Sequence, residues 1–178
     1  MKKIGLLVLL LGLAACGFRP LYVERTGGKF YYDGKFDASV VNEMSKIKVS
    51  PISERFGQQI RNNLLDLLTP KGTPQDAKYF LKAVVSDKTV SQQAMQSDVT
   101  ATNERIKYVI KYELRSDKET LVTGDSVAFV SYDILANPYS TTMAQKKAEE
   151  DAAKVIADDI ALRLGAYFHS QLGTENDL

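Results

Sequence analysis

Apolar and polar residues alternate through the middle of the chain with the two-residue period of a β-strand. The clearest run is 105–115, where apolar side chains stand at every second position, mostly between charged ones. This pattern predicts a strand with one face in the core and the other in water. Similar patterns at 45–50 and from residue 78 predict two more strands, and the β-rich segment 120–132 predicts a fourth that forms a hairpin with 105–115. The polar link at about 89–103 could be a mobile loop or an extension of the strands.

Two other segments have the spacing of amphipathic helices. The first follows Ser53 and ends at Thr69-Pro70, and the second covers about 140–171, with alanines along the start of its apolar stripe. The predicted order is therefore β-α-β-β-β-α. Helices with one apolar stripe and a sheet with one apolar face bury both by packing together. We therefore predict an α+β fold, a two-layer sandwich in which two helices cover one face of a four-stranded, mostly antiparallel sheet.

The composition divides the chain into three regions. Residues 1–15 carry Lys2 and Lys3, then a short apolar run, then small residues, which predicts a signal peptide too short to span a bilayer. Residues 16–44 are rich in turn formers and predict a tether and an irregular lead-in. Residues 45–178 are predicted to form a single domain, because the 163 residues left after cleavage suffice for one core.

The end of the signal peptide, Leu13-Ala14-Ala15-Cys16, resembles the lipobox of bacterial lipoproteins. In that class the cysteine receives a diacylglycerol, the chain is cut before it, and the new amino terminus is acylated, commonly with palmitate. The alternative is an ordinary secretory signal, but Cys16 is the only cysteine in the chain. Gly17 stands where an aspartate commonly retains such proteins at the inner membrane. The resemblance therefore implies a lipid anchor at Cys16, on the periplasmic side of the outer membrane.

Charge balance and the scarcity of reactive side chains argue against several functions. Loss of Lys2 and Lys3 leaves 21 basic residues against 22 acidic ones, unlike a nucleic-acid-binding protein. The only histidine, His169, has no accompanying nucleophile motif, so we expect no enzyme activity. One histidine and a lipidated cysteine do not complete a metal site, and no glycine-rich phosphate loop follows a strand. We therefore expect neither a metal nor a cofactor.

The strand pattern also places basic side chains on the sheet face away from the helices. Alternation assigns nine residues to that face: Lys46, Lys48, Lys78, Lys82, Lys88, Arg105, Lys107, Lys111 and Arg115. This strongly basic face could be a solvated surface whose lysines protect the sheet against aggregation. It could instead bind an anionic partner, such as a phosphorylated glycolipid or an acidic protein wall. For the second interpretation, the predicted ligand-binding residues are Lys82, Lys88, Arg105, Lys107, Lys111 and Arg115.

Three sequence features together resemble the LptE family of lipopolysaccharide-assembly lipoproteins. They are the β-α-β-β-β-α order, the Asn137-Pro138-Tyr139 lead into an alanine-rich acidic helix, and the start of the mature chain, Cys16-Gly17-Phe18-Arg19-Pro20-Leu21-Tyr22. The resemblance implies a non-enzymatic plug in the outer-membrane β-barrel LptD, which aids barrel assembly and binds lipopolysaccharide on its way to the cell surface. Of the family's functional positions, only the lipidated cysteine carries over, to Cys16.

Other functions remain open at this stage. An auxiliary lipoprotein of an ABC-type lipid-trafficking system would also join a lipobox to a small α/β domain. A pilotin for a secretin would differ from the first interpretation only in the identity of its barrel. An envelope hydrolase is the third alternative, and it would have to depend on His169.

Overall fold

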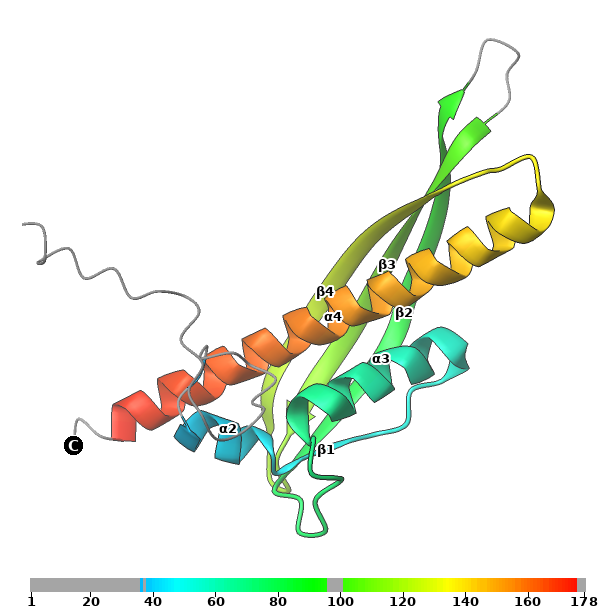
Figure 1. The fold of residues 1–178 in the computed structure, drawn as a ribbon. Coiled ribbons are helices and arrows are strands. Elements are labelled where there is room, and N and C mark those ends of the chain that lie inside the picture. Colours follow the sequence, from blue (N-terminus) through cyan, green and yellow to red (C-terminus); the bar gives the residue numbers. More distant parts are fainter. Residues whose placement is uncertain (1–35, 37, 96–100, 176–178) are drawn as a thin grey trace, which may run out of the picture. The chain divides into compact units, whose positions relative to one another are not determined.

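Four strands form one sheet in the order β1-β2-β3-β4 (Figure 1). This computed structural model describes Phe36, residues 38–95 and residues 101–175, all of which belong to the unit Tyr31–Leu178. In chain order, the elements are α2 (Ala38–Met44), β1 (Ile47–Val49), α3 (Glu54–Leu68), β2 (Tyr79–Met95), β3 (Ala101–Arg115), β4 (Thr120–Asp133) and α4 (Pro138–Glu175).

The sheet is mixed, with antiparallel pairing in its larger part. β1 pairs with β2 in parallel over three residues, whereas β2–β3 and β3–β4 are antiparallel. The β2–β3 pairing continues as far as Met95 and Ala101. Most of the polar link at 89–103 is therefore an extension of the two strands and not a separate loop.

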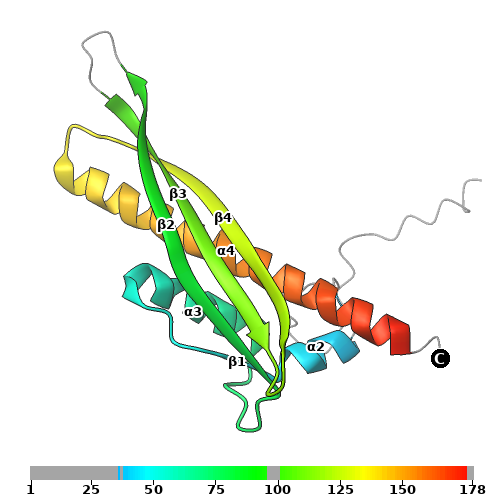
Figure 2. The ribbon, with the colours of Figure 1, turned by 180° about the vertical axis from the view of Figure 1, so that it is seen from behind.

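Helices α3 and α4 lie on the same face of the sheet, and the view from behind shows the strands in front of them (Figure 2). The predicted α+β fold, with two layers and the order β-α-β-β-β-α, is thus confirmed, and a third helix, α2, adds to it.

Ser53 occupies the N-cap position of α3, but its side chain makes no capping hydrogen bond. Within the described ranges, no helix is both long enough and apolar enough to cross a membrane.

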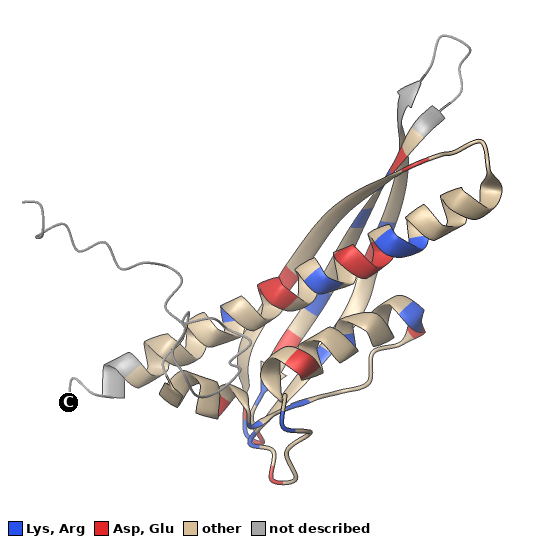
Figure 3. Ribbon diagram, viewed as in Figure 1, with Lys and Arg blue, Asp and Glu red and all other residues tan. Residues whose placement is uncertain are grey.

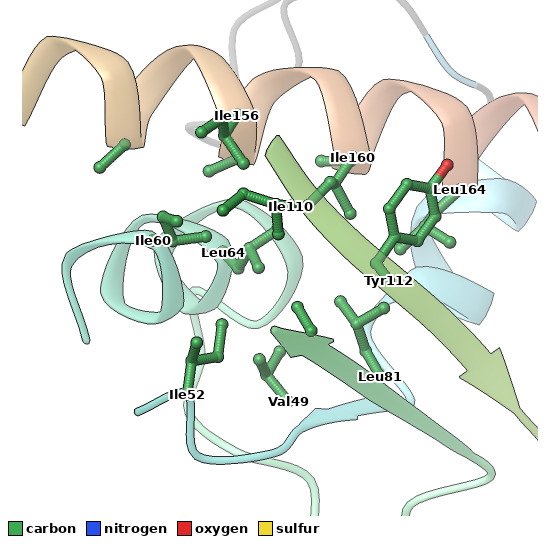
Figure 4. Close-up of a cluster of buried hydrophobic side chains, with 14 of the residues drawn as sticks. Val49, Ile52, Ile60, Leu64, Leu81, Ile110, Tyr112, Ile156, Ile160 and Leu164 are labelled. Atoms are coloured by element: carbon green, nitrogen blue, oxygen red, sulfur yellow. The ribbon is translucent and has the colours of Figure 1, made fainter. Parts of the chain in front are cut away.

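The core lies between the two layers (Figure 4). Ile110 from β3 meets Ile60 and Leu64 from α3 and Ile160 from α4, and all four side chains are fully buried. Small residues let α4 approach its neighbours closely, because Ala152, Ala153, Ala157 and Ala161 are also fully buried. The apolar stripes predicted for β3 and for both helices therefore meet in one core.

The folded part begins earlier than residue 45, the predicted boundary. Helix α2 buries Val40 and Met44, where the sequence predicted an irregular lead-in. The ring of Phe36 packs so closely on α4 that a Cβ atom added at Gly165 would lie 2.2 Å from it. The prediction was wrong here because α2 has only seven residues, too few for a helical period to stand out from the turn formers before it.

Candidate ligand-binding face of the sheet

Five of the six predicted ligand-binding residues do lie on the sheet face away from the helices, which we call the outer face. On β3, Ile106, Ile110 and Leu114 are fully buried against the helices. The residues between them therefore point to the other side, as alternation requires. The predicted residues found on this face are Lys82, Arg105, Lys107, Lys111 and Arg115.

The placement predicted for Lys88 is wrong. A β-bulge between Val85 and Asp87 shifts the register of β2, so that Lys88 pairs with the buried Tyr108 and faces the helices. A bulge inserts one residue into a strand and thereby reverses the side on which every later side chain lies. Polar residues around the bulge, such as Ser86, gave no apolar period from which this shift could have been inferred.

On the helix side, Lys88 joins a cluster centred on Glu149 of α4. The Glu149 carboxylate accepts hydrogen bonds from Lys88 Nζ at 3.3 Å, Arg55 Nη2 at 3.2 Å and Tyr108 Oη at 3.3 Å. Burial lowers the pKa of Lys88, but its hydrogen bonds with Tyr108 and Glu149 outweigh this effect and leave the pKa raised. Lys88 is thus a charged structural contact between β2, β3 and α4, and it is removed from the candidate binding face.

Two other lysines assigned to the basic face, Lys46 and Lys78, also have a local partner. Glu43 lies 2.5 Å from Lys46 Nζ and 3.4 Å from Lys78 Nζ, and Tyr79 Oη donates a hydrogen bond to it at 2.9 Å. Burial alone would raise the pKa of Glu43, but the hydrogen bonds from Lys46 and Tyr79 and the two positive charges lower it. Lys78 and Tyr79 therefore help to hold α2 beside the start of β2, whereas the pair between Lys46 and Glu43 is local to the end of α2.

Acidic residues share the outer face, so it is less basic than predicted. Lys82 is opposite Glu113, and Lys111 is opposite Asp125. Arg115 Nε also lies 3.4 Å from a Glu113 oxygen. Figure 3 shows basic and acidic positions interleaved along the strands. Alternation fixes only the side of the sheet on which a side chain lies, and these acids stand at outward-facing positions of their strands, as the bases do.

Arg105 and Lys107 differ from Lys82, Lys111 and Arg115, each of which lies close to an acid of this chain. Arg105 is flanked by two serines on the neighbouring strands, and Lys107 is flanked by Thr89 and Phe129. Within the described ranges, neither Arg105 nor Lys107 takes part in an ion pair. Of the five predicted ligand-binding residues on this face, these two are the most available to an anion.

An exposed aromatic ring lies directly beside these two cations. Phe129 of β4 is 54% exposed, and Arg105 Cζ lies 4.6 Å from the centre of its ring. Paired cations next to an apolar ring suit a ligand that combines anionic groups with hydrocarbon. The sequence analysis missed Phe129 because residues 127–130 are all apolar, so no alternation indicates on which face the ring lies.

Chemistry other than binding has little support in the described ranges. His169 is exposed near the end of α4, and no group of three or more histidine, cysteine, aspartate or glutamate residues is arranged to hold a metal within these ranges. Lys82 lines a cavity of about 440 Å³ together with Pro51 and Val84, at the point where β1 ends. This cavity contains no cluster of titratable groups that would indicate an active site.

Comparisons with known proteins bear on both the fold and the function. The family model described as LptE, lipopolysaccharide-assembly, matches residues 44–164. A protein described as a lipoprotein from Caulobacter crescentus CB15 is similar in structure, with 24% identity and a TM-score of 0.62 over 74% of this chain and 97% of that chain. Lipoprotein B of Nitrosomonas europaea has 10% identity and a TM-score of 0.52, over 72% of this chain and 85% of its own. A minor lipoprotein of Acinetobacter baumannii has 13% identity and a TM-score of 0.51, over 68% and 92%. No curated protein sequence matches the chain.

Proposed function

Because this chain belongs to the LptE family of lipopolysaccharide-assembly proteins, we propose that it binds lipopolysaccharide and acts together with the outer-membrane β-barrel LptD. We further propose that the mature protein is held by a lipid anchor on the periplasmic side of the outer membrane. It would then plug the barrel, aid barrel assembly and pass lipopolysaccharide toward the cell surface. The family is non-enzymatic, and in this role the protein binds its ligand without changing it chemically.

The observation that carries the proposed lipopolysaccharide binding is the group formed by Arg105, Lys107 and Phe129. Lipopolysaccharide presents phosphates beside hydrocarbon chains. A guanidinium can pair with a phosphate through two parallel hydrogen bonds, and a lysine adds a point charge. Phe129 offers an exposed apolar surface next to both. Lys82, Lys111 and Arg115 contribute to the same face, but each lies close to an acid of this chain.

Charge reversal at the two most available cations tests this site. We expect Arg105→Glu/Lys107→Glu to lower the affinity for lipopolysaccharide by about tenfold or more, since each exposed ionic contact contributes up to about 1 kcal/mol and reversal adds repulsion. Binding of purified lipopolysaccharide at two salt concentrations is the measurement, and raised salt should weaken the wild type more than the variant.

A matched control for this experiment lies on α4. Lys146→Glu/Lys154→Glu makes the same change in net charge at two exposed positions of the helix layer, and it should leave the affinity close to that of the wild type. Both variants should melt like the wild type. If the Arg105/Lys107 variant binds as tightly as the control variant, the outer face is only a solvated surface.

The proposed anchor at Cys16 lies outside the described residues and is tested separately. Two or three acyl chains anchor a protein stably, because each buried methylene contributes about 0.8 kcal/mol. Cells fed a fatty-acid analogue should label the wild-type protein, whereas Cys16→Ser should carry no label and should leave the membrane fraction. Label that persists on Cys16→Ser would disprove the assignment.

A further inference from the structure

Strand β4 has one edge that no other strand covers within the described part of the chain. It is the terminal strand of the sheet and pairs only with β3. Its 14 residues make this a long edge. An uncovered edge presents backbone N–H and C=O groups that a further strand can pair with.

The hydrogen bonds of β1 identify which residues of β4 direct these groups outward. Tyr79 N donates to Lys46 O, and Ser50 N donates to Leu81 O, so the odd-numbered residues at the start of β2 point toward β1. Their even-numbered neighbours must then point toward β3, because successive residues of a strand point to opposite edges. These even-numbered residues of β2 pair with odd-numbered residues of β3, so the even-numbered residues of β3 point toward β4. Their partners in β4 are also even-numbered, and the odd-numbered residues of β4 therefore point toward the open edge. These residues are Thr123, Asp125, Val127, Phe129 and Ser131.

The side chains of these residues are exposed on the outer face. Val127 and Phe129 form the apolar centre of the edge, and Asp125 lies two residues before Val127. A binding partner would thus meet a row of backbone donors and acceptors, two apolar side chains and one carboxylate. Addition of an extended strand satisfies the backbone groups and places alternate side chains beside the apolar pair.

The opposite edge of the sheet is covered at its start and interrupted by a bulge, whereas that of β4 is not. β1 covers β2 as far as Leu81, and the bulge between Val85 and Asp87 interrupts the edge beyond it. Bulges and short covering strands are devices that stop sheet edges from pairing. β4 contains no proline, and its register is regular from Val122 to Asp133. This strand therefore lacks both a proline and, from Val122 onward, a bulge, two features that prevent a further strand from pairing.

We propose that the open edge of β4 receives an extended strand from the barrel partner. This inference rests on the proposed function, and it adds a contact surface and a binding mode. The complementary strand has apolar residues opposite Val127 and Phe129 and a basic residue opposite Asp125, because these pairs bury apolar surface and match charge.

Proline at Val127 tests the backbone contact directly. Val127→Pro removes an N–H that points to the open edge, and it leaves the β3–β4 hydrogen bonds in place. Val127→Thr keeps that N–H and the branched shape of the side chain, and it is the matched control. We expect Val127→Pro to recover at least tenfold less LptD from detergent-solubilised outer membranes than the wild type, and Val127→Thr to recover a similar amount.

Folding and alternative partners are controlled in the same experiment. Thr123→Pro removes another outward N–H and should act in the same direction if Val127→Pro proves unstable. Equal recovery of LptD by folded proline variants would overturn the inference. Failure of the wild type to recover LptD would instead overturn the proposed function. A dimer of the isolated chain that Val127→Pro converts to a monomer would assign the edge to a second copy and also overturn the inference.

Discussion

Ile110→Asp should destabilise the domain more than any other single change considered for this protein. The side chain of Ile110 is fully buried among residues from α3 and α4 (Figure 4). A carboxyl group at this position would be buried without a partner, at a cost of several kcal/mol. This is a large part of the stability of an ordinary domain. We expect the melting temperature, followed by circular dichroism, to fall by more than about 10 °C.

The neighbouring residue provides the control for this prediction. Lys111 is exposed on the outer face, and Lys111→Gln loses only a cross-strand contact with Asp125. Its free energy of unfolding should stay within about 1 kcal/mol of the wild-type value. Similar melting of the two variants would show that the register assigned to β3 is wrong.

Glu149→Ala should have the second largest effect on stability. The change leaves the hydroxyl of Tyr108, a residue that is 1% exposed, without its carboxylate acceptor. An unsatisfied buried polar group costs about 1–3 kcal/mol. Arg55 and Lys88 are much more exposed, so loss of their ion pairs should add little. We expect denaturant unfolding to show a loss of about 2 kcal/mol.

Two variants show whether this loss arises from the cluster around Glu149. Glu150→Ala removes the next carboxylate along α4, which is exposed, and should change stability by no more than about 0.5 kcal/mol. In a Tyr108→Phe background, which has no hydroxyl to satisfy, Glu149→Ala should cost less than in the wild type. An unchanged cost in that background would mean that Tyr108 does not depend on Glu149.

The strands and helices could be predicted from the sequence where a long periodic pattern defines one apolar face that packs against the other layer of the fold. The run 105–115 identified β3 and its buried face because five apolar residues alternate there without interruption. The same reasoning failed at Lys88. The bulge before it is a feature of the backbone pairing, and no pattern of side chains in the sequence indicates it. The same reasoning also missed α2, whose stability comes from contacts with α4 and not from its own short sequence.

The candidate binding face was only partly predictable for a related reason. Alternation along single strands correctly assigned Arg105 and Lys107 to the outer face. It did not indicate which acids would lie opposite the other bases, because the pairing of β3 with β2 and β4 depends on the register of whole strands. The location of Phe129 beside Arg105 likewise follows from the β3–β4 register, although the two residues are 24 positions apart in sequence.

Helix α4 has a consequence for how the protein is made. It is the last of the described elements, yet it packs against α2, α3, β3 and β4 and supplies one side of the core. The earlier elements cannot complete the burial of their apolar faces until α4 has been synthesised, because α4 supplies one side of the core. Until then the nascent chain stays open and thus in a form that a translocation channel for unfolded polypeptides can accept. The apolar strands stay exposed in the meantime, and a chaperone would find its binding sites there.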